Sequence, residues 1–272
     1  MYPTFTASIE EVNETVCNVG KWVVAAGVFG FVVHGLFFVF VVTQSFNPSF
    51  PISPVSILFA PIVIIYIVAL IKIRGLKNVS GDDLFSTGPI VIIAGLIFNL
   101  ITGFLLFSVL TGFGTEPHTI FNPFAFLFTI LFSNVAGLIV LVGNIMLAIA
   151  FWHFGELNRS NLIRLGAVLQ ILLNVIFLSF IGDIGLILIG LQLYFLASKG
   201  RETLSSPTTL MVIKNELLRG KPSGTVVDLR KTAETYGLPP YLLIPLVKQW
   251  ITVGELKGML DGHKYVSYGT DM

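Results

Sequence analysis

A set of amide side chains lies within the long apolar stretches of this sequence. In the central part of the predicted membrane spans, His34 is the one group that could titrate. The amides recur beside glycine at helical spacing, so each set shares one face of a helix. They are Asn99, Asn134, Asn144, Gln170 and Asn174. Such amides either bond neighbouring helices together or line a polar pocket, and we favour the first use for these residues and for His34.

Motifs of the common catalytic sites are absent from the sequence. There is no Glu-x-x-His carboxylate site, zinc motif, P-loop, Gly-rich dinucleotide turn or pair of haem histidines. The central part of each predicted span lacks Asp, Glu, Lys and Arg, which argues against ion coupling. Cys17 is the single cysteine, so an intramolecular disulfide is excluded. We therefore expect no enzyme, no cofactor and no metal site.

The composition indicates that lipid solvates most of the chain. Apolar residues make up 54% of the sequence, charged residues 11%, and the mean hydropathy is +0.88. A helix needs about 20 apolar residues to cross the hydrocarbon core of a bilayer. Four stretches meet this requirement: Trp22–Thr43, Val55–Ile73, Gly88–Leu110 and Pro123–Phe151.

A fifth stretch, Leu165–Ser198, is too long for one span. Its 34 residues would form a helix of about 51 Å. The segment "FIGDIG" lies in its middle, where glycine can turn the chain and Asp183 can cap a new helix. The sequence therefore predicts two helices, Leu162–Phe180 and Ile184–Ser198, joined at Gly182–Asp183.

The basic residues predict the orientation of these helices. Cytoplasmic loops are enriched in Lys and Arg. With six spans, every basic residue outside a span falls on one side, whereas the three opposite loops have none. Three glycosylation-type triplets, at Asn13, Asn78 and Asn158, fall on the same side and weigh against this orientation. We give the charge more weight and expect a multi-pass protein of the cell membrane with both termini in the cytoplasm.

The last seventy-odd residues have the pattern of a small soluble domain. A helix begins at Pro207, Asp228 caps a second, and Pro239-Pro240 precedes a third, which carries Trp250 on its apolar stripe. A short β segment, "GTVV", precedes the second helix, and the pair Asp261-Gly262 marks a final hairpin. This order of elements is that of a winged helix.

The predicted fold class is thus an all-α bundle of six transmembrane helices followed by a small α+β winged-helix domain. The expected division has four parts. They are a cytoplasmic segment (1–20), the transmembrane domain (21–198), a linker (199–206) and the winged helix (207–272).

The solvent face of the winged helix favours a protein partner over DNA. Residues 199–272 carry ten basic and seven acidic groups, short of a strong phosphate-binding surface. The expected partner-binding residues combine aromatic, amide and sparse basic groups, a mixture that suits a protein interface. They are Tyr241, Lys248, Gln249, Lys257, His263 and Lys264.

Two parts of the chain resemble known families. The segments "RGLKNVSGDDLFSTGPIVIIAGLI", "AFWHFGELNRSNLIRLGAVLQI" and "FIGDIGLILIGL" resemble a family of uncharacterised multi-helix membrane proteins from thermoacidophilic archaea. This resemblance implies an archaeal plasma membrane but no activity. The segment "TAETYGLPPYLLIPLVKQWITVGELKGMLDGHKYV" resembles the winged helices of PCI-type scaffold subunits, which chiefly make protein contacts.

Three functions remain open on the sequence alone. The favoured one is a membrane adaptor or accessory subunit whose winged helix docks a protein at the membrane surface. The alternative is a membrane-bound transcription regulator that senses a lipid, a small molecule or the state of the envelope. A facilitative channel or transporter comes third, because no buried charge is expected.

Overall fold

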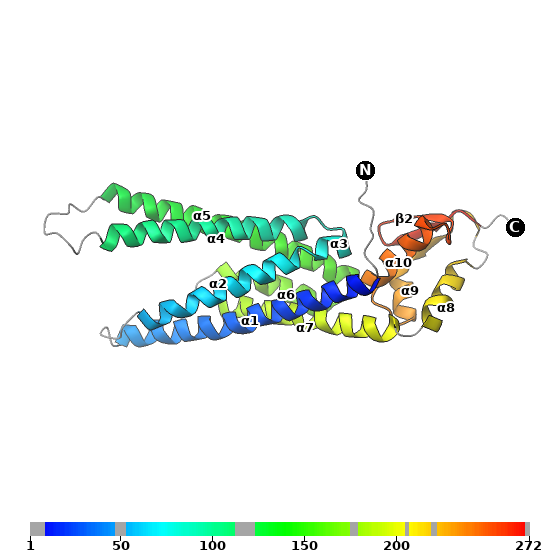
Figure 1. Ribbon diagram of the computed structural model, residues 1–272, viewed down its shortest axis with the longest axis horizontal. Helices are drawn as coiled ribbons and strands as arrows, with labels where there is room; N and C mark the ends of the chain where they lie inside the picture. Colours follow the sequence, from blue (N-terminus) through cyan, green and yellow to red (C-terminus); the bar gives the residue numbers. More distant parts are fainter. Residues whose placement is uncertain are drawn as a thin grey trace.

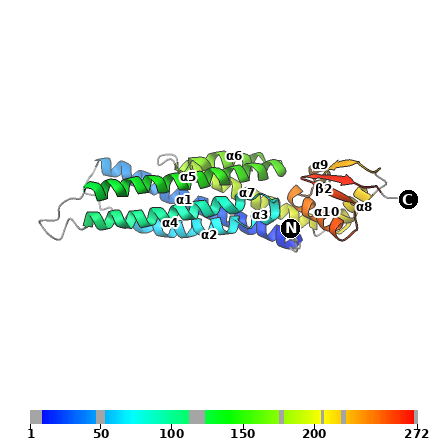
Figure 2. The same cartoon turned by 90° about the horizontal axis from the view of Figure 1, so that it is seen from above.

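The computed structural model describes residues 9–46, 53–111, 123–174, 179–204, 207–218 and 222–269. The molecule is elongated. Long helices run side by side along one axis, and a small domain with a β-sheet stands at one end of them (Figure 1). The view from above gives the same arrangement (Figure 2).

The bundle is built from long helices joined by short connections. The long ones are α1 (Ile9–Phe46), α2 (Ser53–Ile73), α4 (Leu84–Thr111), α5 (Pro123–Leu157) and α7 (Ser179–Leu204). The shorter ones are α3 (Leu76–Ser80), α6 (Asn161–Gln170) and the 3-10 helix η1 (Ile171–Asn174).

Four of these helices are long and apolar enough to cross a membrane. The qualifying parts are Ile9–Leu36 of α1, Leu84–Thr102 of α4, Leu127–Leu157 of α5 and Ser179–Glu202 of α7. Their outward surfaces carry large apolar side chains, such as Leu100 at 69% exposure and Phe195 at 62%. Water would solvate so many exposed apolar groups poorly, which fits a membrane protein.

The long apolar run does form two helices, but not with the predicted boundaries. α6 and η1 end at Asn174, and α7 starts at Ser179. The predicted turn at Gly182–Asp183 is wrong, because both residues lie inside α7 and are buried. One of the two glycines that suggested a turn, Gly185, serves helix packing instead. An added Cβ on Gly185 would come within 2.6 Å of the carbonyl oxygen of Gly166 in α6.

Glycine also brings α1 and α7 together, in antiparallel contact. A Cβ on Gly20 of α1 would lie 2.9 Å from the carbonyl oxygen of Gly190 in α7. One on Gly27 would lie 2.8 Å from the carbonyl oxygen of Asp183. The two backbones can therefore approach closely only because these positions lack side chains.

The C-terminal domain combines three helices with a three-stranded antiparallel sheet. Its elements are α8 (Pro207–Leu218), β1 (Val226–Asp228), α9 (Leu229–Thr235), α10 (Pro240–Thr252), β2 (Gly258–Asp261) and β3 (Lys264–Ser267). The strands lie in the order β1-β3-β2. Asp228 caps α9 through the backbone N–H of Arg230, as expected. Gly262 turns the β2–β3 hairpin with a φ of 56°.

The predicted linker 199–206 is mostly helix. Residues 199–204 continue α7 without a break, and 205–206 lie outside the described residues. Helix α7 therefore extends to within three residues of Pro207, where the first helix of the domain begins.

Candidate functional site

The C-terminal domain is fastened to the bundle by the hydroxyl of Tyr241, at the start of α10. This hydroxyl donates to Asn13 Oδ1 of α1 at 2.7 Å, and Asn13 Nδ2 donates to the carbonyl oxygen of Ala197 in α7 at 3.0 Å. One side chain of α1 thus connects α7 to the domain. Gly200 makes room for the contact, since a Cβ there would lie 2.6 Å from Asn13 Oδ1.

A second amide accepts a hydrogen bond from a backbone N–H group at the start of α10. The first backbone N–H groups of a helix have no partner within it. Pro239, at the cap position, offers no side-chain acceptor. Asn158, between α5 and α6, accepts from the backbone N–H of Tyr241 at 3.3 Å and donates to the carbonyl oxygen of Phe154 at 2.9 Å. The membrane helices therefore cap a helix of the C-terminal domain.

The interface is apolar beneath these bonds. The ring of Tyr241 is fully buried, with its centroid 6.0 Å from that of Phe154 in α5. Burial, and to a lesser extent the electrostatic effect of nearby Cys17, raises the pKa of the Tyr241 hydroxyl, so this group stays protonated and keeps donating.

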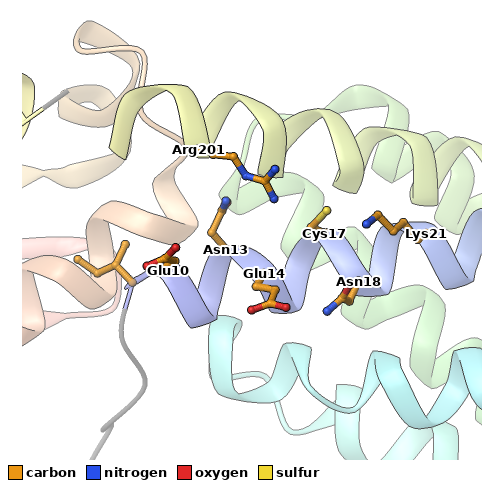
Figure 3. Close-up of a pocket in the computed structure, with 8 residues that line it drawn as sticks. Glu10, Asn13, Glu14, Cys17, Asn18, Lys21 and Arg201 are labelled. Atoms are coloured by element: carbon orange, nitrogen blue, oxygen red, sulfur yellow. The ribbon is translucent and has the colours of Figure 1, made fainter. Parts of the chain in front are cut away.

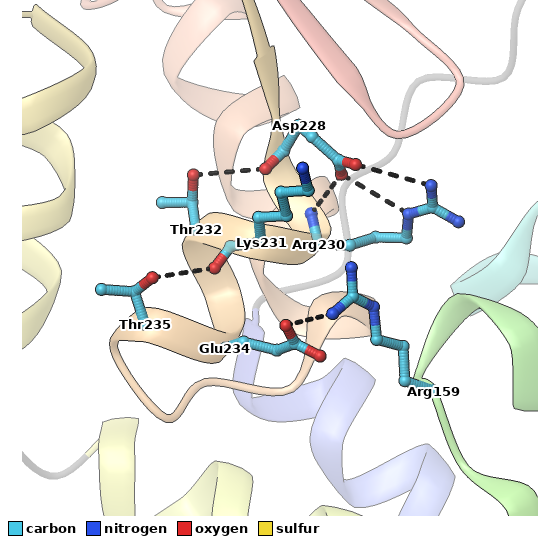
Figure 4. A network of polar contacts seen from close by, with 7 residues as sticks. All are labelled: Arg159, Asp228, Arg230, Lys231, Thr232, Glu234 and Thr235. Carbon is cyan, nitrogen blue, oxygen red and sulfur yellow. Dashed lines mark hydrogen bonds and ion pairs between the residues drawn. The ribbon is translucent and has the colours of Figure 1, made fainter.

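An ion pair links the bundle to the domain beside this interface (Figure 4). Arg159, which follows α5, pairs with Glu234 of α9. Within the domain, burial alone would raise the pKa of Asp228. The side-chain and backbone hydrogen bonds of Arg230 outweigh that effect and hold the pKa below its usual value. Exposed pairs such as Arg159–Glu234 contribute little stability, so Tyr241 and its neighbours dominate the contact.

The predicted partner-binding residues divide into two groups. The prediction that Tyr241 lies on the solvent face is wrong, because the bundle itself covers it. His263 is half-buried. The other four residues are exposed on the domain: Lys248, Gln249, Lys257 and Lys264.

A buried acid lies within the bundle, contrary to the sequence prediction. Asp183 in α7 is 2% exposed, and its Oδ2 lies 2.6 Å from Nδ1 of His34 in α1. The predicted turn had placed Asp183 outside the spans, so the expectation of a bundle free of internal charge is wrong as well. The sequence signal that could have indicated a partner for His34 was Gly30, which lies four residues before it on the same face of α1.

The amides predicted inside the bundle have different surroundings. Asn144 of α5 is buried and accepts from Tyr66 of α2 at 3.0 Å, a bond between helices. Asn134 is exposed and donates to Ile130 of its own helix at 2.9 Å. Asn99 is exposed near Ser133, whose Oγ lies 3.5 Å from Asn99 Oδ1.

Two further amides lie in or next to η1. Gln170 is fully buried, and neither atom of its amide has a hydrogen-bond partner among the described residues. Asn174 ends η1, but its side chain lies outside the described residues.

A polar hollow of about 610 Å³ lies beside the first turns of α1 (Figure 3). Lys21 of α1 and Arg201 of α7 point into it, near Cys17. Two acids from α1, Glu10 and Glu14, also line it. Its charges balance, so the hollow has no clear preference for an anion or a cation. Among the described residues, no three His, Cys, Asp or Glu side chains come together to hold a metal.

Comparison of the chain with models of known families, with curated proteins and with solved structures finds no match.

Proposed function

We propose that the chain is an integral membrane adaptor or accessory subunit whose cytoplasmic winged helix docks a protein partner at the membrane surface. The observation that carries this proposal is the burial of Tyr241 against α1 and α5. It fixes one side of the domain on the bundle and leaves the opposite side free.

The order of elements supports a winged helix. Helix, strand, two helices and a hairpin follow one another from α8 to β3. The hairpin strand β3 lies between β1 and β2, as the wing of such a domain requires. In this fold the third helix, here α10, is the element that usually enters the major groove of DNA.

The position of α10 favours a protein partner over DNA. Residues Pro240 to Leu243 at its start are buried, and Tyr241 among them contacts the bundle. In recognition helices the N-terminal residues contact the bases, so this placement blocks that use. The exposed remainder offers Lys248 and Gln249.

The outer face of the sheet supplies an apolar surface. Val226 and Met259 both pair with Val266 across the sheet, so the three side chains share one face. Val226 is 56% exposed and Met259 48%. Lys257 and Lys264 are exposed next to them. An apolar centre with a charged rim is typical of a protein interface.

The proposed topology places this surface in the cytoplasm. α6 and η1 together are about 23 Å long, shorter than the roughly 30 Å of the hydrocarbon core. We propose that α6 and α7 form a helical hairpin that enters the membrane from the cytoplasmic side. Such a hairpin returns the chain to the side that it left, so both termini stay cytoplasmic, as six spans also require.

A pull-down from native membranes tests the adaptor proposal. The tagged wild-type chain should retain a protein partner after nuclease treatment. Met259→Asp, which puts a charge into the apolar face, should lose it. Met211→Asp is the matched control, because Met211 is 65% exposed on α8, away from the sheet.

The alternative is the membrane-bound regulator, which the winged-helix order of elements favours. If the chain is such a regulator, nuclease treatment should remove what the tagged chain retains in the pull-down, and Lys248→Ala should weaken that binding. Retention that depends on nucleic acid and ignores Met259→Asp would reject the adaptor.

A further inference from the structure

The carboxylate of Asp183 is closely packed between α1 and α7. It is almost fully buried, and its contact with His34 Nδ1 measures 2.6 Å. Gly30 lies one turn before His34 on the same face of α1, and a Cβ at Gly30 would overlap the carboxylate. Gly30 thus leaves the space that the Asp183 carboxylate occupies, and the imidazole of His34 contacts that carboxylate.

The charge of the pair depends on one proton. With one proton bound, the pair has no net charge, whether the proton resides on the imidazole or on the carboxyl. Without it, a bare carboxylate is buried among apolar residues, which is strongly unfavourable. A second proton leaves an equally unfavourable positive charge. We propose that His34 and Asp183 form a proton-binding site that holds one proton in the interior of the bundle.

The described residues around the pair include no other charge that could replace this proton. From α2, Tyr66 lies within electrostatic reach of Asp183, and its hydroxyl is bonded to Asn144 of α5. From α6, the backbone nitrogen of Gln170 lies next to Gly185, two residues after Asp183. The charged side chains in the described parts of the helices around the pair all lie towards the end that carries the C-terminal domain. They are Glu10, Glu11, Glu14, Lys21, Lys72, Glu156, Arg164, Lys199, Arg201 and Glu202.

The site lies on the two helices that hold the domain. Contacts between α1 and α7 run from Asp183 and Gly30, through Gly190 and Gly20, to Ala197 and Asn13. Asn13 in turn accepts from Tyr241 of the domain. Loss of the proton weakens the contact at one end of this pair of helices, so the proton site and the docking of the domain are coupled through them.

Thermal unfolding of the full-length chain in detergent, measured against pH, tests the proton site. Folding binds a proton, so the wild-type midpoint should fall as pH rises through the loss of that proton. A drop of roughly 4 °C or more between about pH 6 and pH 9 is expected. Asp183→Asn keeps the shape without the charge and should abolish the drop.

The matched control uses a second His–Asp pair. His153 Nδ1 lies 2.9 Å from Asp82 Oδ2, but the His153 side chain is 56% exposed. His153→Gln should leave the alkaline drop unchanged. A drop that survives in Asp183→Asn, or that disappears in His153→Gln, overturns the proposal.

If Asp183→Asn does not fold, infrared difference spectra of the wild type test whether the His34–Asp183 pair binds a proton. Carboxyl and imidazole bands that titrate together over the same pH range are the expected result. A carboxylate band that stays constant across the range shows a pair that binds no exchangeable proton, and the proposal fails.

Cys17 reports the coupling to the domain. It is the single cysteine, and it is buried on α1 between Asn13 and Gly20. Its labelling by a maleimide should accelerate with pH more steeply in the wild type than in Asp183→Asn, which carries the same cysteine. Identical pH profiles for the two proteins would show that the pair and the docked end are independent.

Discussion

Two asparagines join the domain to the bundle. Asn13 bonds to both α7 and Tyr241, and Asn158 bonds to both α5 and the backbone of α10. Both amides are buried, so a lost partner would leave a polar atom without compensation. Both also belong to glycosylation-type triplets, and their burial removes two of the three triplets that weigh against a cytoplasmic location, while the third, at Asn78, is exposed.

Removing the Tyr241 hydroxyl should therefore destabilise the protein measurably. We expect Tyr241→Phe to cost about 1–2 kcal/mol, because Asn13 Oδ1 loses its donor. Tyr241→Ala, which also leaves a cavity, should cost about 3–5 kcal/mol. Denaturant unfolding of the solubilised protein measures both values. Tyr268→Phe is the control, since Tyr268 is 56% exposed, and equal losses for Tyr268→Phe and Tyr241→Phe would contradict the assignment.

Sequence reasoning identified Tyr241 as important but assigned it to the wrong surface. The apolar stripe of α10 was visible from Leu243, Leu246, Val247 and Trp250, and Tyr241 lies off that stripe. A residue off the stripe of a soluble helix is expected to face water. Here it faces a second apolar surface, the start of α1, which the sequence gives no means to place beside it.

At the scale of whole elements, glycine determines which helices pair. Gly20 and Gly190 face each other between α1 and α7, and Gly88 and Gly143 do so between α4 and α5. Because lipid offers no hydrophobic reason for helices to associate, close backbone approach supplies much of the attraction.

Filling one of these contacts should separate the helices. In Gly190→Ala the new Cβ would lie 2.6 Å from the backbone nitrogen of Val24 and 2.8 Å from the carbonyl oxygen of Gly20, so backbone must move. We expect a loss of about 1–3 kcal/mol in thermal or denaturant unfolding. Gly137→Ala has no atom within 4 Å of its new Cβ and should be neutral or slightly stabilising. A neutral Gly190→Ala would disprove the close crossing.

The helices were predictable from hydropathy, but the break in the last apolar run was not. Leu165 to Ser198 is apolar on both sides of the break, so hydropathy has no minimum there. Glycine was the remaining signal, and it is ambiguous because it marks both turns and close packing. The same error hid Asp183, since a turn residue was not expected to face His34.

For the whole molecule, the basic residues and the domain lie at the same end. Figure 1 shows α3 and the start of α1 beside the C-terminal domain. Lys21, Arg74, Lys77 and Arg159 all belong to this end of the bundle. This distribution is the one that the positive-inside rule requires of a cytoplasmic face.

We expect a C-terminal tag to resist protease in intact cells. The native Cys17 is buried, so its rate of labelling reports local opening of α1 and not the side of the membrane on which it lies. A cysteine introduced at the exposed Lys248 should resist an impermeant maleimide until the cells are opened. Labelling of that cysteine in intact cells, or digestion of the tag, would reverse the orientation.

The continuity of α1 has a mechanical consequence. Its 38 residues form a rod of about 57 Å, nearly twice the thickness of the hydrocarbon core. Helices respond to a thinner bilayer by tilting. Because the domain is bonded to the far end of this rod at Asn13, a tilt of about 10° would sweep it sideways by roughly 10 Å. The docked domain thus lies at the end of a lever arm, and we expect its position over the membrane to shift with the thickness of the bilayer beneath it.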